Sequence, residues 1–281
     1  MAVRIIVDST ADLPEGIAER LTVVPLSVRF GDEEFIQGVD ITNRQFYEKL
    51  VESDVLPTTS QATPYQFEEA FSQAVGGGDT VVCITLSQKL SGTHQSAMVA
   101  AAEFPGQVYV VDSESVAIGA GILAQLALTL AEQGKTAQQV YDCLLEERKK
   151  IRVLAMLDTL EYLKKGGRIS KTVAFAGELL QLKPVVSLEG GEIKMLGKAR
   201  GSKQANNLLV QLIGKVGGVD FTRPLLLGYT GLSDVLLQKY IRDSAALWEG
   251  QTQKLPQTII GSVVGTHAGP GAVAVAFFSA E

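Results

Sequence analysis

Short, nearly continuous apolar runs alternate with helical patterns through the first half of the chain. The runs at residues 3–8, 22–30, 80–85 and 108–112 predict strands. Strands buried on both faces have such sequences, so the runs favour a mainly parallel sheet covered by helices. Helices are predicted at residues 43–52, 64–75, 92–103, 115–132 and 136–150, with Asn43, Thr63, Ser115 and Thr136 as their N-terminal caps.

The pattern changes after residue 150. The segment "VLAMLDTL" is strand-like, and "PVVSLEGGEIKMLGKAR" predicts a hairpin that turns at residues 189–191. Two further helices, 203–216 and 233–247, bracket the apolar strand "PLLLGYTG". The expected fold class is α/β, with an N-terminal helix-covered, mainly parallel sheet domain (residues 1–155) and a C-terminal α+β domain (residues 156–281).

Composition and charge narrow the classes of protein. Of the 281 residues, 46% are apolar and 20% charged, which is typical of a folded soluble protein, and the net charge of −6 weighs against a nucleic-acid partner. The N-terminus lacks the features of a signal peptide, and the longest apolar run, 116–131, is shorter than the roughly 20 residues that span a bilayer. The two cysteines form no paired motif. We therefore expect a cytoplasmic protein without integral membrane association.

Five loops gather small polar or basic residues: "DST", "PTTSQATP", "LSGTHQS", "KKGGRISK" and "GTHAGPG". Ligands of doubly wound sheets bind beyond the carboxyl ends of the strands, where "DST" and "LSGTHQS" are expected to lie. The second of these opens a predicted helix, and the unpaired N–H groups of a helix start suit an anion. Because it lacks the lysine of a P-loop, a nucleotide site is not supported.

Hydroxyl groups in two of these loops have two interpretations. Thr59 and Ser60 either bind a ligand, or one of Thr59, Ser60 and Thr63 merely caps the following helix. Ser91 can offer its hydroxyl and its backbone N–H, and Gly92 lets a ligand approach the backbone closely, but a plain helix cap is again the alternative.

Both histidines of the chain fall in these loops. His267 can donate a hydrogen bond to an anion or accept a proton, or it is a structural loop residue. His94 lies one turn into a predicted helix and either reaches the site or completes a polar face. Two histidines without a carboxylate or thiolate at ligand spacing do not predict a metal site. Arg168 and Arg200 suit bidentate binding of a carboxylate or phosphate, with a solvated basic turn as the alternative.

Six segments together resemble the DegV family of bacterial fatty-acid-binding proteins. They are "VDSTADLP", "PTTSQATP", "LSGTHQSA", "DTLEYLKKGGRIS", "LKPVVSLEGGEI" and "GTHAGPGAVAV", in the order of the family and spread over residues 7 to 275. Each segment is a weak signal, whereas the ordered set is specific. Two departures are Ala62, where the family usually has proline, and His94, where it often has tyrosine.

The resemblance implies a two-domain protein that holds one long-chain fatty acid, of the palmitate or stearate class, between its domains. The tail would lie in an apolar tunnel, without any further cofactor. Members of the family are not enzymes themselves: each presents the fatty acid to a separate ATP-dependent fatty acid kinase, which forms an acyl phosphate for phospholipid synthesis. Transient contact with a membrane for lipid exchange is expected.

The resemblance also implies roles for individual residues. The carboxylate-binding residues would be Thr59, Ser91, Gly92 and His267, the residues for kinase docking or phosphate stabilisation Arg168 and Arg200, and the accessory residues Ser60 and His94. Two rival hypotheses remain open. One is a small-anion hydrolase or phosphotransferase that uses His267 and Arg168. The other is a regulatory or interaction module in which a bound lipid is only structural.

Overall fold

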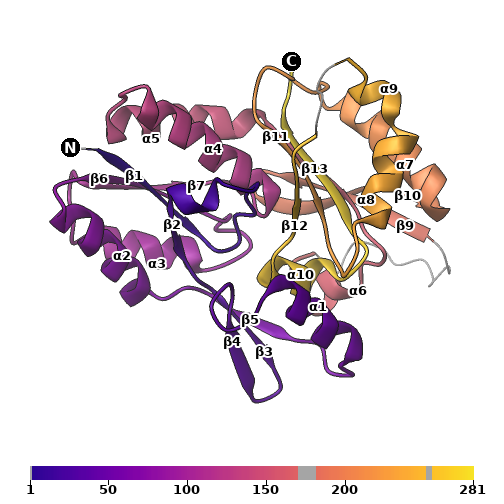
Figure 1. The fold of residues 1–281 in the computed structure, drawn as a ribbon, viewed down its shortest axis with the longest axis horizontal. Coiled ribbons are helices and arrows are strands. Elements are labelled where there is room, and N and C mark those ends of the chain that lie inside the picture. The colour runs from indigo at the N-terminus through magenta and orange to yellow at the C-terminus, as the bar shows by residue number, and fades with distance from the viewer. Residues whose placement is uncertain (1, 170–181, 251–254) are drawn as a thin grey trace.

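The computed structural model describes residues 2–169, 182–250 and 255–281 (Figure 1). A parallel four-stranded sheet in the N-terminal half has the order β2-β1-β6-β7. Its strands are β1 (Val3–Asp8), β2 (Thr22–Val24), β6 (Thr80–Thr85) and β7 (Val108–Asp112). The prediction of a parallel sheet in this half is confirmed.

A six-stranded mixed sheet forms most of the C-terminal half, in the order β10-β9-β8-β13-β11-β12. Its strands are β8 (Ile151–Met156), β9 (Leu182–Glu189), β10 (Glu192–Arg200), β11 (Leu225–Tyr229), β12 (Gln257–Ile259) and β13 (Val273–Phe278). The predicted hairpin is the β9–β10 pair, which turns at Gly190 and Gly191, both with positive φ. The α/β fold class is therefore confirmed.

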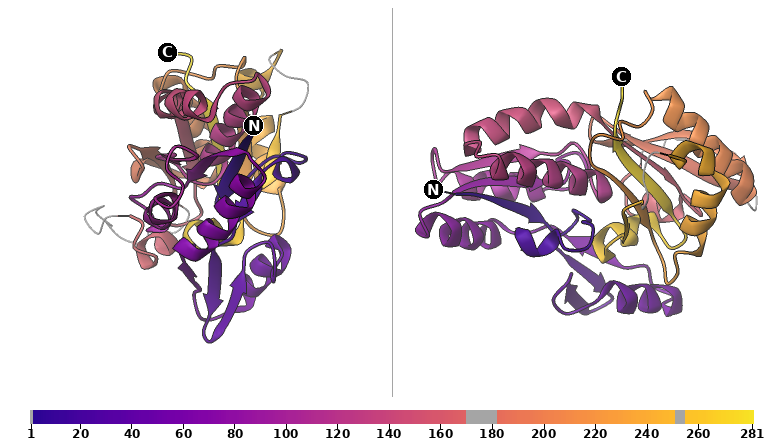
Figure 2. Two further views of the ribbon diagram at one scale, coloured as in Figure 1. Left: turned by 90° about the vertical axis from the view of Figure 1, so that its left-hand side faces the viewer. Right: turned by 45° about the horizontal axis from the view of Figure 1, so that its top comes forward.

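A third sheet, antiparallel and of three short strands, projects from the rest of the molecule (Figures 1 and 2). It consists of β3 (Ser27–Phe30), β4 (Glu33–Ile36) and β5 (Thr58–Ser60). The single strand predicted at residues 22–30 is therefore wrong: β2 and β3 belong to different sheets. Pro25 lies between them, and proline has no N–H with which to continue a hydrogen-bonded ladder.

Helices occupy most of the predicted positions. They are α1 (Asn43–Glu52), α2 (Pro64–Gly76), α3 (Thr93–Ala101), α4 (Ile118–Glu132), α5 (Ala137–Glu147), α6 (Glu161–Lys165), α7 (Gly201–Lys215), α8 (Val235–Asp243), α9 (Ala245–Trp248) and α10 (Ser262–Ala268), with short 3₁₀ turns η1 (Ala18–Arg20) and η2 (Arg148–Lys150).

Two of the four predicted caps are confirmed and two are wrong. Thr63 and Thr136 cap α2 and α5 through reciprocal capping boxes. The cap of α1 is Thr42, one residue before Asn43, because its hydroxyl accepts the N–H of Gln45. Helix α4 begins only at Ile118, after Ala117 at φ 56°, so the Ser115 side chain does not cap it.

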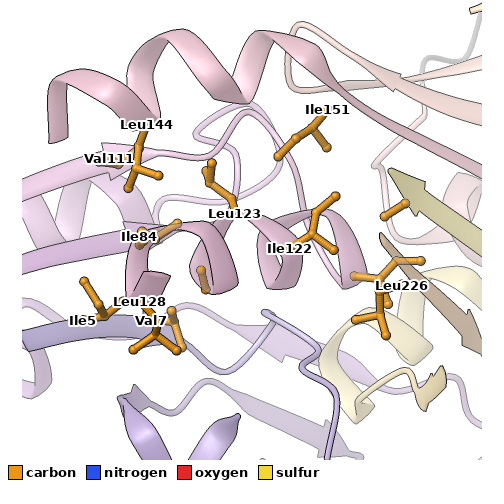
Figure 3. Close-up of a cluster of buried hydrophobic side chains, with 14 of the residues drawn as sticks. Ile5, Val7, Ile84, Val111, Ile122, Leu123, Leu128, Leu144, Ile151 and Leu226 are labelled. Carbon is orange, nitrogen blue, oxygen red and sulfur yellow. The ribbon is translucent and has the colours of Figure 1, made fainter. Parts of the chain in front are cut away.

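Helix α4 lies between the parallel sheet and the mixed sheet and contacts both of them (Figure 1). In Figure 3 its side chains Ile122 and Leu123 lie among those of Ile84 in β6, Ile151 in β8 and Leu226 in β11. Each fully buried Leu or Ile side chain contributes about 1.5–3 kcal/mol to folding. The two halves of the chain therefore share one core. The predicted domain boundary at residues 155/156 falls within β8, and the division into two domains stays a prediction.

Small residues allow α4 to approach its neighbours closely. A Cβ at Gly121 would overlap the main-chain carbonyl oxygen of Asp12, and one at Gly119 would overlap the side chains of Ser115 and Val153. The backbone carbonyl cannot yield as a flexible side chain can. Glycine at 121 is therefore a packing requirement, despite its poor helix propensity.

We predict that Gly121→Ala lowers the free energy of unfolding by about 1–3 kcal/mol, because overpacking against backbone outweighs the gain in helix propensity. The matched control is Gly214→Ala in α7, where a Cβ meets nothing within 4 Å. That variant should be neutral or up to about 1 kcal/mol more stable. Urea unfolding measures both. A Gly121→Ala protein as stable as Gly214→Ala would contradict this account of the packing.

Candidate functional site

A cavity of about 220 Å³ lies where the three sheets and α10 meet. For comparison, an engineered apolar cavity of about 150 Å³ holds a benzene molecule. It is bounded by the carboxyl end of the parallel sheet, by the start of α4 and by one face of the mixed sheet. The predicted site loops after β1 and β6 therefore reach the cavity, as the rule for ligand sites in doubly wound sheets expects.

The body of the cavity is apolar. On the mixed sheet, the cavity is faced by three small residues: Ala155 of β8, Ala274 of β13 and Ala272, which directly precedes β13. Their short side chains leave space over the sheet. The rest of the apolar lining comes from larger side chains, among them Leu26, Leu86, Leu90, Leu157, Leu163, Val186, Ile193, Ile260, Val263 and Val264. A cavity of this kind suits a hydrocarbon chain.

Polar residues gather at one end, which we call the mouth: Thr59, Ser60, Gln61, Ser91, Gly92, Arg168 and His267. At its centre, Thr59 Oγ1 lies 3.0 Å from His267 Nε2. Thr59 is on β5 of the N-terminal half and His267 is in the last turn of α10 near the C-terminus. The mouth is therefore assembled from both ends of the chain.

His267 is held as a neutral imidazole. Gly166, which follows α6, lies so close to the ring that a Cβ would overlap Nδ1, and that nitrogen is buried with no partner among the described residues. Burial, together with the nearby Arg168 charge, lowers the pKa of His267 to about 4. At neutral pH the imidazole can therefore donate or accept one hydrogen bond at Nε2, depending on its tautomer.

Arg168 brings a positive charge to the same end of the cavity. Its Nε donates to Leu90 O at 3.2 Å and its Nη1 to Gly166 O at 2.6 Å, and within residues 2–169, 182–250 and 255–281 it has no carboxylate partner. Burial lowers the pKa of the guanidinium. A half-buried cation that has no carboxylate partner among the described residues favours the binding of an anion.

Ser91 and Gly92 lie at the start of α3. Ser91 Oγ is 3.0 Å from Thr93 Oγ1 and accepts the Thr93 N–H at 3.2 Å, while the N-cap position of α3 itself is Gly92. Ser91 therefore precedes the cap, and it lines the cavity. Gly92 lets Gln61 pack against it, since a Cβ there would overlap the Gln61 amide oxygen. Gln61 in turn donates to Ser96 Oγ at 3.0 Å. The two predicted hydroxyl loops are thus in contact.

The "DST" loop holds the other loops in place. Asp8 is fully buried, and its carboxylate accepts the Thr10 N–H and hydroxyl on one oxygen and the Leu86 N–H, at 2.6 Å, on the other. This joins the ends of β1 and β6. Burial raises the pKa of Asp8 despite these hydrogen bonds. Of the three residues, Thr10 lines the cavity, so this loop chiefly supports the site.

Other predicted residues lie at the rim or elsewhere. Ser60 is exposed at the mouth. His94 does not line the cavity: its Nδ1 is 2.9 Å from Thr85 Oγ1, and burial lowers its pKa. Arg200 is an exposed residue at the end of β10, outside the cavity. The expectation that His94 stands beside the head group is therefore not supported by its position, because its imidazole is turned toward the end of β6.

Sequence reasoning did not name Gln61, a residue of the mouth, or Gly166, which packs against the His267 ring. Gln61 belongs to "PTTSQATP" and Gly166 to "KKGGRISK", so both lay in loops already singled out. The remainder of the basic loop, Ser170 and Lys171, lies outside the described residues. Within the described part of the chain, no three His, Cys, Asp or Glu side chains are grouped to hold a metal ion, and none of the helices has the length and apolar character needed to cross a membrane.

The fold and the site define a class: an α/β protein with an internal apolar cavity whose mouth carries hydroxyl, imidazole and guanidinium groups. The family model for DegV, described as uncharacterised proteins, matches residues 2–280. The chain belongs to the DegV family, which confirms the resemblance drawn from the six segments.

Relatives and solved structures match along the whole chain. A DegV domain-containing protein of Deinococcus radiodurans is 35% identical, with 98% of each chain covered, and one of Caldanaerobacter subterraneus is 33% identical, again with 98% of each covered. A DegV family protein from Thermus thermophilus, described by its fatty acid binding, superposes with a TM-score of 0.89 at 33% identity, covering 99% of this chain and 100% of that one. DegV of Bacillus subtilis, a fatty acid binding protein, gives 0.83 at 28%, with 98% of each covered.

The buried histidine predicts a dependence of stability on pH. Unfolded His267 binds a proton below about pH 6.5, whereas the folded side chain stays neutral until about pH 4. Its contribution is therefore present above pH 6.5 and is lost as the pH falls toward 4. Between about pH 7 and about pH 4.5, the free energy of unfolding of the native protein should fall by on the order of 1–2 kcal/mol more than that of His267→Gln. Urea unfolding at both pH values measures this, and equal losses would contradict a neutral His267.

Proposed function

We propose that this protein binds one long-chain fatty acid, with the tail in the apolar cavity and the carboxylate at the mouth. One observation carries the proposal: Arg168 and the Thr59–His267 pair stand at the end of an apolar cavity, and Arg168 has no carboxylate partner in the part of the chain that the structure describes. An anion at the end of a hydrocarbon chain matches both parts of this site.

The tail and the carboxylate of the ligand would contribute different amounts of binding free energy. A buried tail contributes about 0.8 kcal/mol per CH₂, so palmitate would gain on the order of 10 kcal/mol before ordering costs. Hydrogen bonds to a charged group add about 1.5–3 kcal/mol. The tail would therefore supply most of the affinity, and Thr59, Ser91, Gly92 and His267 would fix the orientation of the carboxylate.

The solved relatives support this ligand class. The T. thermophilus protein is described by its fatty acid binding, and a protein from Eubacterium ventriosum is described as a stearic acid binding protein; the latter superposes with a TM-score of 0.88 at 26% identity, covering 99% of this chain and 98% of that one. Native mass spectrometry of the purified protein should release a saturated or unsaturated long-chain acid. A protein that emerges empty and does not bind a fluorescent fatty acid would contradict the proposal.

A carrier role is favoured over a hydrolase or phosphotransferase that uses His267 and Arg168. A histidine base is ordinarily oriented by a third group on its other nitrogen, and His267 Nδ1 has no such partner within the described residues. Its low pKa also makes it a weak base at neutral pH. We propose instead that the protein presents the bound carboxylate to a separate ATP-dependent kinase for acyl-phosphate formation in phospholipid synthesis, in the cytoplasm and with transient membrane contact for lipid exchange.

The head-group assignment is tested by comparing a fatty acid with an alcohol of the same chain length. The double variant Thr59→Ala, Ser91→Ala should lose about 3 kcal/mol or more of affinity for palmitate, because two donors to the carboxylate are removed. Its affinity for hexadecanol should change much less. Thr129→Ala is the control, since that exposed hydroxyl bonds only within α4. Isothermal titration calorimetry on the native protein and the two variants measures all six protein–ligand pairs. An equal loss for acid and alcohol would show damage to the tail site.

The kinase assignment is tested with the two arginines. Arg200→Ala should leave palmitate affinity unchanged and lower the rate of acyl-phosphate formation by an added fatty acid kinase about tenfold, as expected for loss of a docking or phosphate contact. Arg168→Ala should lower both quantities, because Arg168 lines the cavity. Arg44→Ala, an exposed arginine on α1, is the control. Full kinase activity with Arg200→Ala would remove that residue from the docking surface.

A further inference from the structure

Helix α10 supplies both a wall of the cavity and the imidazole at its mouth. The residues of α10 that line the cavity are Val263, Val264, His267 and Ala268, which share one face of the helix. The helix has only seven residues, and a helix this short is not stable by itself. The position of His267 therefore depends on the contacts that α10 makes with the rest of the molecule.

Two side chains from the N-terminal half hold the start of α10. Asp12 Oδ1 accepts the N–H of Gly261 at 2.8 Å, and Gln37 Oε1 accepts the N–H of Val263 at 3.0 Å. Gly261, the N-cap residue, has no side chain with which to cap the helix, and a Cβ there would overlap the Gln37 amide nitrogen. Residues far away in the sequence thus satisfy N–H groups that a helix start leaves unpaired.

Asp12 and Gln37 are in turn held by their own neighbours. The Asp12 N–H donates to Ala117 O at 3.2 Å, and the Asp12 carbonyl oxygen packs so closely on Gly121 that a Cβ there would overlap it. Gln37 Nε2 donates to Ser9 O at 2.6 Å. The start of α10 is therefore tied to the first turn of α4 and to the loop after β1.

The other end of α10 carries the pair of groups at the centre of the mouth. His267 Nε2 lies 3.0 Å from Thr59 Oγ1. Between them and the cap, Gly265 packs against Tyr47, where a Cβ would overlap the hydroxyl group. Six residues separate Gly261 from His267, which is about 9 Å of helix. Because a helix moves as one unit over so short a length, a shift at its start also changes the distance between His267 and Thr59.

We propose that Asp12 and Gln37 are positioning residues of the head-group site: they cap α10 and so hold His267 beside Thr59, which sets the preference for a carboxylate over an uncharged head group. The proposal rests on the proposed fatty acid binding. Neither side chain lines the cavity, so their effect on the ligand runs through α10.

Asp12 acts as a neutral acceptor at pH 7. Burial, together with the charge of the nearby Asp8, raises the pKa of Asp12 to about 8. Most of the carboxyl groups are therefore protonated at pH 7, and a carbonyl oxygen remains to accept the Gly261 N–H. Asparagine offers the same acceptor in nearly the same shape. Asp12→Asn should therefore keep the cap of α10, whereas Asp12→Ala removes it.

The first measurement compares palmitate with hexadecanol by isothermal titration calorimetry on the full chain at pH 7. In Asp12→Ala and in Gln37→Ala, the ratio of palmitate to hexadecanol affinity should fall about tenfold, because His267 no longer reaches the carboxylate. Tenfold is the lower end of what one hydrogen bond to a charged group contributes. Asp12→Asn should keep the native ratio.

The second measurement follows the imidazole itself by NMR between pH 5 and pH 8. The chain has two histidines, so His267→Gln identifies the signal of His267. In the native protein and in Asp12→Asn, His267 should stay neutral over this range, because its pKa is about 4. In Asp12→Ala, a displaced α10 gives the ring access to water, and the pKa of His267 should rise toward 6.5, into the measured range.

Asp220→Ala is the matched control. The Asp220 carboxylate also accepts a backbone N–H, that of Thr222 at 3.0 Å, but it lies outside the cavity lining. This variant should keep the native affinity ratio and the native titration of His267.

The outcomes separate a positioning role from a structural one. Asp12→Ala and Gln37→Ala proteins that are less stable, but keep the native affinity ratio and the native titration of His267, would overturn the proposal. A native protein that binds neither palmitate nor hexadecanol would instead overturn the proposed fatty acid binding, and the positioning of its head group with it. Should Asp12→Ala fail to fold, Gln37→Ala decides the question, because it removes the other cap and leaves the buried carboxyl group in place.

Discussion

The burial of α4 between two sheets is the constraint on which the rest of this structure depends. Residues of the helix face β1 and β6 on one side and β8, β11 and β13 on the other, in a single apolar cluster. A helix apolar around most of its circumference has to be covered on more than one side. Separating the two sheets would expose that cluster to water, so the core itself fixes how the halves of the chain are placed.

The position of the site follows from this placement. The start of α4 contributes Val116, Ala117 and Ile118 to the cavity, so the helix that joins the sheets also forms part of the site wall. Hydrogen bonds join the loops around the cavity in the N-terminal half of the chain to those in the C-terminal half. They link Thr59 to His267, Arg168 to Leu90 O, and Ser87 Oγ to Gly191 O at 2.8 Å. The last bond docks the β9–β10 turn on the loop that carries Ser91. Groups that must converge on a small anion are thus held by contacts that do not require the anion.

Helices and strands could be predicted from the sequence where the signal that forms them lies in neighbouring residues. Strands β1, β6 and β7 and helix α1 lie at their predicted bounds, because apolar periodicity and the breakers around it are encoded in adjacent residues. Strand β5 has no such signal: "TTS" becomes a strand only by pairing with β3. Helix α10 was likewise read as a glycine-rich loop, since Gly261 and Gly265 are poor helix formers. Gly265 is required there because a Cβ would overlap the ring of Tyr47.

The residues of the candidate site, too, could be predicted from the sequence only in part. Loops rich in hydroxyls, imidazole and arginine were identifiable from residue types, and the structure brings Thr59, Ser91, Gly92, Arg168 and His267 to one cavity mouth. The turning of His94 toward Thr85 could not be foreseen, because it depends on which side of the β6 end the helix α3 packs. The charge of the groups in the site also depends on the tertiary structure and not on the local sequence. His267 is neutral because the fold excludes water from Nδ1 and puts Arg168 nearby, and with the imidazole neutral, the guanidinium is the group whose charge an anion would balance.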